Sequence, residues 1–247
     1  MNMLMTTVEG LGIVVFALLC GKVVLDLAVA AGTVGPWAVL GIVCFLAGMV
    51  VADLFTGFGH FFADNFGSVD TPILGHVLIY RFRQHHDLPQ LICQGSFREI
   101  NGGLCLLMLP IPALYLAMGG PAASVAGVMA GCFLLGLALF GAGTNQVHRW
   151  AHDVKVPPAV AFLQSTGLLL SKKKHSIHHR APYHLHFCIT NGLINPLLDH
   201  TRAWHHLADL LAWMGVPQAE ESVMGHRRAA LLAEVLAARS LPPSQVA

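Results

Sequence analysis

Four long apolar runs dominate the hydrophobic and polar pattern of the chain. They cover residues 11–32, 36–58, 104–118 and 122–143. A helix needs about 20 mostly apolar residues to cross a membrane, so the pattern predicts four transmembrane helices. The third is short and is interrupted by Pro110 and Pro112. Lys22 and Asp26 lie inside the first run, four residues apart, where they can neutralise one another on one helix face.

The remaining segments, residues 59–103 and 144–240, are predicted to form a helical cap. Every lysine and arginine except Lys22 falls within residues 81–98 or 149–239, whereas the short connections near residues 33–35 and 119–121 contain none. By the positive-inside rule, the cap and both termini should face the cytoplasm. The expected fold is therefore an all-α integral membrane protein, a single domain over residues 1–247 with a cytosolic cap.

Composition narrows the possible function. Charged residues make up only 11% of the chain and the net charge is +1, which disfavours a nucleic-acid binder. None of the six cysteines belongs to a Cys-x-x-Cys pair, and four lie in predicted spans, so we interpret them as packing residues. Histidine is the exception in this apolar chain, because its 15 copies outnumber the 14 lysines and arginines combined.

Eight of the histidines occur in groups whose spacing suits metal binding. Positions three or four apart share one face of a helix, and two histidines four apart on a helix can chelate one ion. On the second span, residues 53, 57, 60 and 64 also share a face. The candidate ligands are His60, Asp64, His85, His86, His148, His152, His175, His178 and His179.

Four or five ligands satisfy one ion, so eight imidazoles and a carboxylate predict two metals. No His-Glu-x-x-His motif of a zinc protease is present, and the groups lie beyond the span ends, unlike a transporter site near the bilayer midplane. Two irons that activate O2 beside the acyl region fit best, because no side chain alone attacks an unactivated C–H bond. The expected reaction uses O2 and two electrons and removes two hydrogens from adjacent carbons of a lipid chain.

The same pattern of residues allows other functions. A diiron lipid hydroxylase would use the same metals and leave oxygen in its product, and a zinc-binding membrane transporter or sensor is a more distant alternative. An acyltransferase is disfavoured because His60 and Asp64 are four residues apart and not five. Asp53 is either a residue supporting the metal site or a solvated carboxylate near the interface.

Several further polar residues are candidates for supporting roles. Glu99, Asn101 and Asn145 could contact the ligands directly or through water. His184 and His186 could contact ligands or substrate, and the pair His205–His206 is expected at the membrane interface, on an amphipathic stretch over residues 202–216.

The motifs around these histidines resemble those of the membrane lipid desaturase family. That family includes plasmanylethanolamine desaturase, its bacterial carotenogenesis-regulating counterpart and a plant plastid desaturase acting on phosphatidylglycerol. The resemblance covers about residues 50–200 and is carried by DLFTGFGHFFADNFGS (53–68), FRQHH (82–86), TNQVHRWAH (144–152), FLQ (162–164), SKKKHSIHHRAPY (171–183) and FCIT (187–190). It implies a diiron centre, ligated by the histidines, that introduces a double bond into a membrane phospholipid.

One departure affects the expected substrate. Plasmanylethanolamine-type members carry His-Asp-Phe where this chain has Gly95, Ser96 and Phe97, so both vinyl-ether formation and phosphatidylglycerol acyl desaturation stay open. No transit peptide is visible, which favours a bacterial relative in the inner membrane. No haem, flavin or iron–sulfur motif is visible either, so a separate electron donor of the cytochrome b5 or ferredoxin type is expected.

Overall fold

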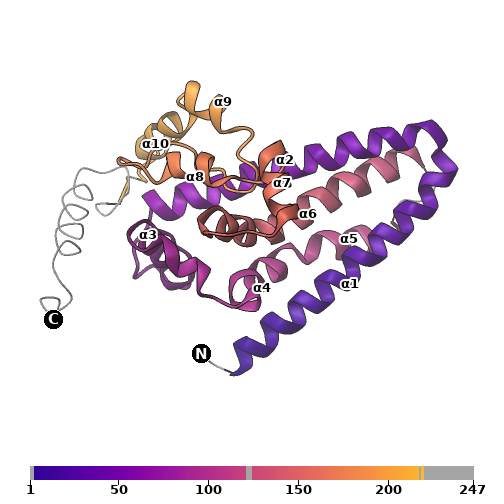
Figure 1. The fold of residues 1–247 in the computed structure, drawn as a ribbon, viewed down its shortest axis with the longest axis horizontal. Coiled ribbons are helices and arrows are strands. Elements are labelled where there is room, and N and C mark those ends of the chain that lie inside the picture. Colours follow the sequence, from indigo (N-terminus) through magenta and orange to yellow (C-terminus); the bar gives the residue numbers. More distant parts are fainter. Residues whose placement is uncertain (1–2, 121–123, 217, 220–247) are drawn as a thin grey trace, which may run out of the picture.

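The computed structural model describes residues 3–120, 124–216 and 218–219, and this part of the chain contains helices and no strand (Figure 1). The elements are α1 (Met3–Val34), η1 (Gly35–Trp37), α2 (Ala38–Asn65), η2 (Gly75–Ile79), α3 (Tyr80–Asp87), η3 (Pro89–Cys93), α4 (Phe97–Met108), α5 (Pro110–Ala117), α6 (Val125–His152), α7 (Pro158–Thr166), α8 (Lys172–His178), α9 (Asn195–His200) and α10 (Ala203–Trp213).

Within the described residues, four stretches of helix are long and apolar enough to cross a membrane: Met3–Gly32, Val39–Asn65, Phe97–Ala117 and Val125–His152. Their outer faces carry exposed apolar side chains such as Leu18, Leu25 and Val29 on α1, which suit contact with lipid. The chain is therefore an all-α integral membrane protein, as the four apolar runs predict.

The helices extend beyond the apolar runs that mark them in the sequence. The second span continues to Asn65 and the fourth to His152, because each helix carries its polar end into the cap. The third begins at Phe97, ahead of the expected Leu104, and it consists of α4 and α5 joined at Leu109, just before Pro110. A proline inside a helix removes one backbone hydrogen bond, which explains the break.

Two glycines allow α2 and α6 to pack closely. A Cβ at Gly48 would lie 2.0 Å from the carbonyl oxygen of Phe133, and one at Gly136 would lie 2.2 Å from that of Phe45. Such close approach of two backbones is the usual role of small residues between membrane helices. Because His60 and His148 follow these two glycines at equal distances along the chain, the contact brings both histidines to the same end of the bundle.

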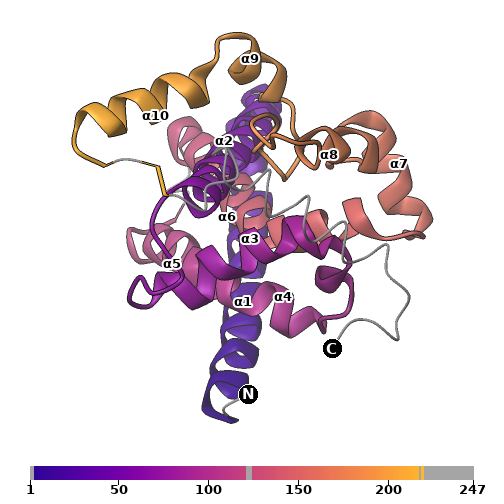
Figure 2. The ribbon, with the colours of Figure 1, turned by 90° about the vertical axis from the view of Figure 1, so that its left-hand side faces the viewer.

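The cap covers that end of the bundle. Figures 1 and 2 show α3, α8, α9 and α10 gathered around the ends of α2 and α6. Trp204 of α10 stacks on Phe61 of α2 with ring centroids 5.1 Å apart, and Arg83 of α3 donates to the carbonyl oxygens of Ala63 and Phe66 at the end of α2. The predicted cap residues 220–240 lie outside the described part of the chain.

Candidate metal centre

The face of α2 formed by residues 53, 57, 60 and 64 is turned toward the protein interior. Asp53, His60 and Asp64 are all fully buried. Gly57 provides the room for a loop to lie against this face, since a Cβ there would come within 2.5 Å of the Cys188 Sγ atom. The sequence spacing of these four positions therefore corresponds to a single functional surface.

The first cluster of candidate ligands, which we call the Asp64 group, combines one carboxylate with three imidazoles. The Asp64 Oδ2 atom lies 3.0 Å from the His86 Nε2 atom, 3.3 Å from that of His60 and 3.5 Å from that of His178. All four side chains are buried, and one ligand atom from each lies within 4.8 Å of those of the others. The group joins α2, α3 and α8.

Backbone carbonyls orient two of these imidazoles. The His60 Nδ1 atom lies 3.1 Å from the carbonyl oxygen of Phe187, and the His178 Nδ1 atom lies 2.8 Å from that of Leu185. When Nδ1 carries the proton and donates it to a carbonyl, Nε2 keeps its lone pair for a metal. The segment 185–187 thus directs two Nε2 atoms into the Asp64 group.

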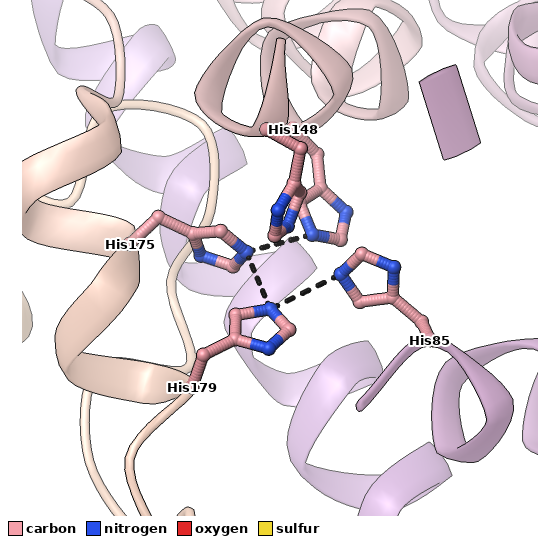
Figure 3. A group of neighbouring side chains, drawn as sticks. His85, His148, His175 and His179 are labelled. Atoms are coloured by element: carbon pink, nitrogen blue, oxygen red, sulfur yellow. Dashed lines mark hydrogen bonds between the residues drawn. The ribbon is translucent and has the colours of Figure 1, made fainter. Parts of the chain in front are cut away.

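The second cluster, the five-histidine group, contains only imidazoles (Figure 3). The Nε2 atom of His175 lies 2.9 Å from that of His148 and 3.0 Å from that of His179, which is 3.1 Å from that of His85. His152 completes the group, and one nitrogen of each ring lies within 4.8 Å of the others. The five rings come from α3, α6 and α8 with its C-terminal neighbour His179.

The spacing of the nitrogens fits a shared ion. Two nitrogens bound to one metal at about 2.1 Å each stand ~3.0–3.4 Å apart, depending on the angle between them. The close Nε2 pairs of both groups fall at or near this range. In addition, the buried atoms His60 Nε2, Asp64 Oδ1 and His152 Nε2 have no hydrogen-bond partner among the described residues. Buried polar atoms without a partner are unfavourable unless a ligand satisfies them.

The protonation state of the rings outside the spans also suits metal binding. Burial, reinforced by the neighbouring ring of His152, holds the pKa of His85 well below its usual range. Burial and neighbouring imidazoles also lower the pKa values of His175 and His179. These rings therefore stay neutral at pH 7, and the neutral form is the one that binds a metal.

The two groups are direct neighbours. The ring centroids of His86 and His179, one from each group, lie 5.1 Å apart, and those of His178 and His179 lie 5.6 Å apart. Together the groups contain all nine residues that the sequence singles out as candidate ligands. The division of these nine residues into two sets suits two ions that lie side by side. That they bind metal remains a prediction.

Asp53 is buried and holds the backbone of residues 190–192 in place. Its carboxylate accepts hydrogen bonds from the backbone N–H groups of Thr190, Asn191 and Gly192 at 2.8–3.0 Å. These residues follow closely, after residues 188 and 189, the segment whose carbonyls orient His60 and His178. The alternative of a solvated interfacial carboxylate is wrong, because Asp53 is fully buried.

Two residues that no sequence pattern marked as site candidates also hold this loop in place. Thr190 lies within hydrogen-bond distance of Thr56 on α2 and Thr144 on α6, at 3.2 and 3.1 Å between hydroxyl oxygens. Asn195 accepts from the Cys188 N–H and donates to the Cys188 carbonyl oxygen. The motif FCIT contained Thr190, but no regular spacing marked Asn195.

The other three supporting candidates have different positions. Asn145 donates to the Ile100 carbonyl oxygen at 3.0 Å, and Asn101 donates to the Gln146 Oε1 atom at 3.2 Å, so both connect α4 to the helix carrying His148 and His152. Glu99 is exposed and forms a reciprocal cap with Ser96 at the start of α4. The expectation that Glu99 supports the metal ligands is therefore corrected, because its carboxylate caps the N-terminus of α4.

Four further cap histidines, His184, His186, His205 and His206, lie outside both groups. His186 pairs with Asp199, and the ring of His184 lies 5.5 Å from that of His205, measured between centroids. His206 is exposed on α10. None of these rings belongs to the clusters of close ligand atoms found among the described residues.

Comparison with known proteins identifies the family. The model of the lipid desaturase domain matches residues 49–219. Plasmanylethanolamine desaturase 1 of Mus musculus is 38% identical, over 81% of this chain and 74% of its own length. The plasmanylethanolamine desaturase of Myxococcus xanthus is also 38% identical, over 72% and 62%. Fatty acid desaturase 4 of Arabidopsis thaliana, a chloroplastic protein, is 35% identical, over 65% and 48%.

The matches span less than two thirds of the length of the bacterial and plant relatives. No solved structure matches the chain. The family model alone covers more than half of the chain, and it includes every residue of the Asp64 and five-histidine groups. The chain belongs to the lipid desaturase family and is a membrane enzyme of the oxidoreductase class.

Proposed function

We propose that this chain is an O2-dependent diiron desaturase that introduces a double bond into an alkyl or acyl chain of a membrane phospholipid. The observation that carries the proposal is the pair of adjacent buried ligand groups at the ends of two membrane-length helices. The reaction converts a –CH2–CH2– unit, O2, two electrons and two protons into –CH=CH– and two waters.

The residues of the site have distinct roles in this proposal. The Asp64 group and the five-histidine group would each hold one iron ion. The bound irons would supply the activation of O2 that attack on an unactivated C–H bond requires. The carbonyls of Leu185 and Phe187 keep His178 and His60 in the tautomer that presents Nε2 to the ion.

Burial of the site would also protect the reaction. Nearly all of the candidate ligands are buried, and Asp64, His60 and His178 are fully so. A closed, dry site keeps reactive species away from water and from side reactions. The proposed substrate chain would reach the ions from the bilayer, because His60 and His148 sit on helices that themselves cross it.

The electrons would come from a separate protein of the cytochrome b5 or ferredoxin type. The absence of a haem, flavin or iron–sulfur motif in the sequence supports this part of the proposal. The basic residues concentrated at the metal end of the bundle support a cytoplasmic orientation of this end, in a bacterial inner membrane.

The choice between an alkyl ether and an acyl chain stays open in this proposal. Two relatives are named for plasmanylethanolamine and the plant ones for fatty acids. Gly95 and Ser96, where the ether-type branch differs, lie at the start of α4: Ser96 caps the helix and the Gly95 carbonyl oxygen accepts from Arg149. The missing His-Asp pair of the ether-type branch therefore involves none of the nine candidate ligands, and its absence does not weaken the diiron proposal.

Lipid mass spectrometry tests the proposal. In cells that express the chain, a phospholipid two hydrogens lighter than its precursor should appear with oxygen and be absent without it. A product heavier by one oxygen atom would instead identify a hydroxylase. Unchanged lipid profiles, together with a purified protein that holds a single zinc, would contradict the proposal.

A further inference from the structure

A polar cavity of about 330 Å³ opens beside the metal centre, and the proposed reaction does not yet use it. This volume lies in the range of small-ligand sites, which is about 300–1,000 Å³. The cavity lies between the loop that follows His179, helix α10 and a residue beyond that helix. Its polar lining includes His184, Arg202, His205, Asp209 and Gln218.

The walls of the cavity are directly connected to the metal ligands. Tyr183, between Pro182 and His184 of the cavity wall, places its ring 5.0 Å from that of His86. On the other side, Trp204 of α10 stacks on Phe61, the neighbour of His60. A molecule in the cavity would thus be held a short distance from the Asp64 group.

The chemistry of the lining suits a group that carries both charges. Arg202, the N-cap residue of α10, supplies a guanidinium and Asp209 a carboxylate, and both line the cavity. His184 and His205 add two imidazoles, and the buried His184 Nδ1 atom has no hydrogen-bond partner among the described residues. A guanidinium and imidazoles match a phosphate diester, and the carboxylate matches an ammonium group.

The three faces of helix α10 have different surroundings, and together they indicate that the cavity lies at the level of lipid headgroups. Trp204 is buried, while His205, Ala208 and Asp209, together with the N-cap residue Arg202, line the cavity. The third face is apolar and exposed: Leu210 is 50%, Met214 62% and Trp213 84% accessible. In a protein with four membrane-length helices, such a face suits the membrane interface, where tryptophan is enriched.

We propose that this cavity binds the zwitterionic headgroup of the phospholipid substrate, a phosphate diester next to a primary ammonium group. Arg202, His184 and His205 donate to the phosphate oxygens, and Asp209 accepts from the ammonium. The headgroup is held here while the lipid chain extends to the metal centre. This inference rests on the proposed desaturase function for the identity of the ligand as substrate.

The binding arm of the test uses short-chain lipids and does not depend on turnover. The detergent-solubilised protein is titrated with dihexanoyl phosphatidylethanolamine, dihexanoyl phosphatidylglycerol or inorganic phosphate, and the rise in unfolding temperature is measured. We expect the ethanolamine lipid to stabilise the protein at the lowest concentration. Stabilisation by inorganic phosphate alone would overturn the assignment to a lipid headgroup.

Adjacent histidines on α10 offer a matched pair of variants. His205→Ala and Arg202→Gln should each weaken binding of the ethanolamine lipid about 10-fold or more, the effect of losing a hydrogen bond to a charged group. His206→Ala, one residue away and outside the cavity, should bind like the wild type. Asp209→Asn should reduce the preference for ethanolamine over glycerol headgroups. Equal binding by all four variants would overturn the proposal.

The turnover arm separates the two proposals. In mixed micelles with increasing mole fractions of phosphatidylethanolamine substrate, His205→Ala and Arg202→Gln should raise KM while iron content stays at the wild-type value. If lipid is desaturated with an unchanged KM, the headgroup site is wrong and the desaturase function stands. If no lipid is desaturated but the short-chain lipid still binds in the His205-dependent manner, the binding site stands and the desaturase function fails.

Discussion

The Asp64 group and the five-histidine group lie side by side but differ in charge and in exposure. The Asp64 group has one carboxylate and is buried throughout, whereas the five-histidine group has neutral imidazoles only and includes the partly exposed His179. An ion in the first group would have part of its charge neutralised by its ligands, and an ion in the second would not. The protein thus offers two sites of different electrostatic character within one centre.

The construction of the two groups explains this difference. Of the four membrane-length helices, two carry candidate ligands, and each of these serves one group: α2 supplies His60 and Asp64, and α6 supplies His148 and His152. The cap segments serve both, because adjacent histidines on a helix point about 100° apart. His85 and His86 are divided between the groups in this way, as are His178 and His179.

Removal of one ligand from each group should have the largest effect. His178→Ala and His175→Ala should each reduce desaturated product more than about 100-fold, beyond the range seen when only a supporting residue is lost. Each variant should also lose the ion of its own group first. Product is measured by lipid mass spectrometry and metal by elemental analysis. Equal loss of product in His206→Ala would mean that the histidines act only through folding.

Asp64→Asn addresses the charge difference between the groups. The amide keeps the size of the side chain and removes its negative charge, so the ion of the Asp64 group should be held more weakly and that of the five-histidine group should stay. We expect activity to fall about 10- to 100-fold. Metal bound per chain, measured during dialysis against a chelator, should fall in one step toward half of the wild-type value. Loss of both ions at equal rates would contradict the division into two groups.

Asp53→Asn tests the loop that orients only the Asp64 group. Asn can accept through one oxygen where Asp53 accepts through two, so at least one of the three backbone N–H groups loses its partner. The variant should lose about 2–3 kcal/mol of stability, the usual contribution of a hydrogen bond to a charged group. Thermal unfolding measures this loss, and the Asp64 group should release its ion first. An unchanged unfolding temperature would mean that the loop is held by other contacts.

The stability of the metal-free protein should depend on pH through the buried imidazoles. Folding lowers the pKa values of His85, His175 and His179 below the unfolded value of about 6.5. Below pH 6.5 the unfolded chain takes up protons that the folded chain does not, so stability is full above pH 6.5 and falls as the pH decreases.

Each such histidine can add up to about 1.4 kcal/mol per pH unit to this loss. Unfolding temperatures measured between pH 5 and pH 8 check the direction. His175→Gln should make the decrease less steep, because one of the titrating rings is gone. A metal-free protein that becomes more stable as the pH falls would contradict the neutral state of these rings.

The smallest effect is expected at the start of α4. Glu99→Gln weakens the reciprocal cap with Ser96 and should lower stability by about 0.5–1 kcal/mol. Metal content and product should not change, because Glu99 is exposed and lies in the helix cap. A clear loss of iron in this variant would mean that Glu99 does support iron binding.

Much of the candidate site could be predicted from local spacing. Residues four apart on a helix share a face whatever the tertiary structure, so the pairs His60–Asp64 and His148–His152 were visible in the sequence alone. The division of His85 from His86 was not, because it depends on how α3 packs between α2 and α6. The role of Asp53 also required the structure, since its partners lie more than 130 residues away in the chain.

At two points the sequence could have predicted more of the structure. Ser96 and Glu99 form the Ser-x-x-Glu signature of a capping box, which favours a helix start over a metal-site role. The apolar runs also marked less than the full length of the helices to which they belong. Both α2 and α6 continue through their candidate ligands to Asn65 and His152.

The number and kind of metal ions per chain test the central claim most directly. Elemental analysis of the purified membrane protein, expressed with sufficient iron, should give two iron ions for each chain. The same measurement on His175→Ala and His178→Ala should give about one, since each variant leaves one group intact. A single zinc ion in the wild type, or iron that is unchanged in both variants, would contradict the claim that these nine residues form a diiron centre.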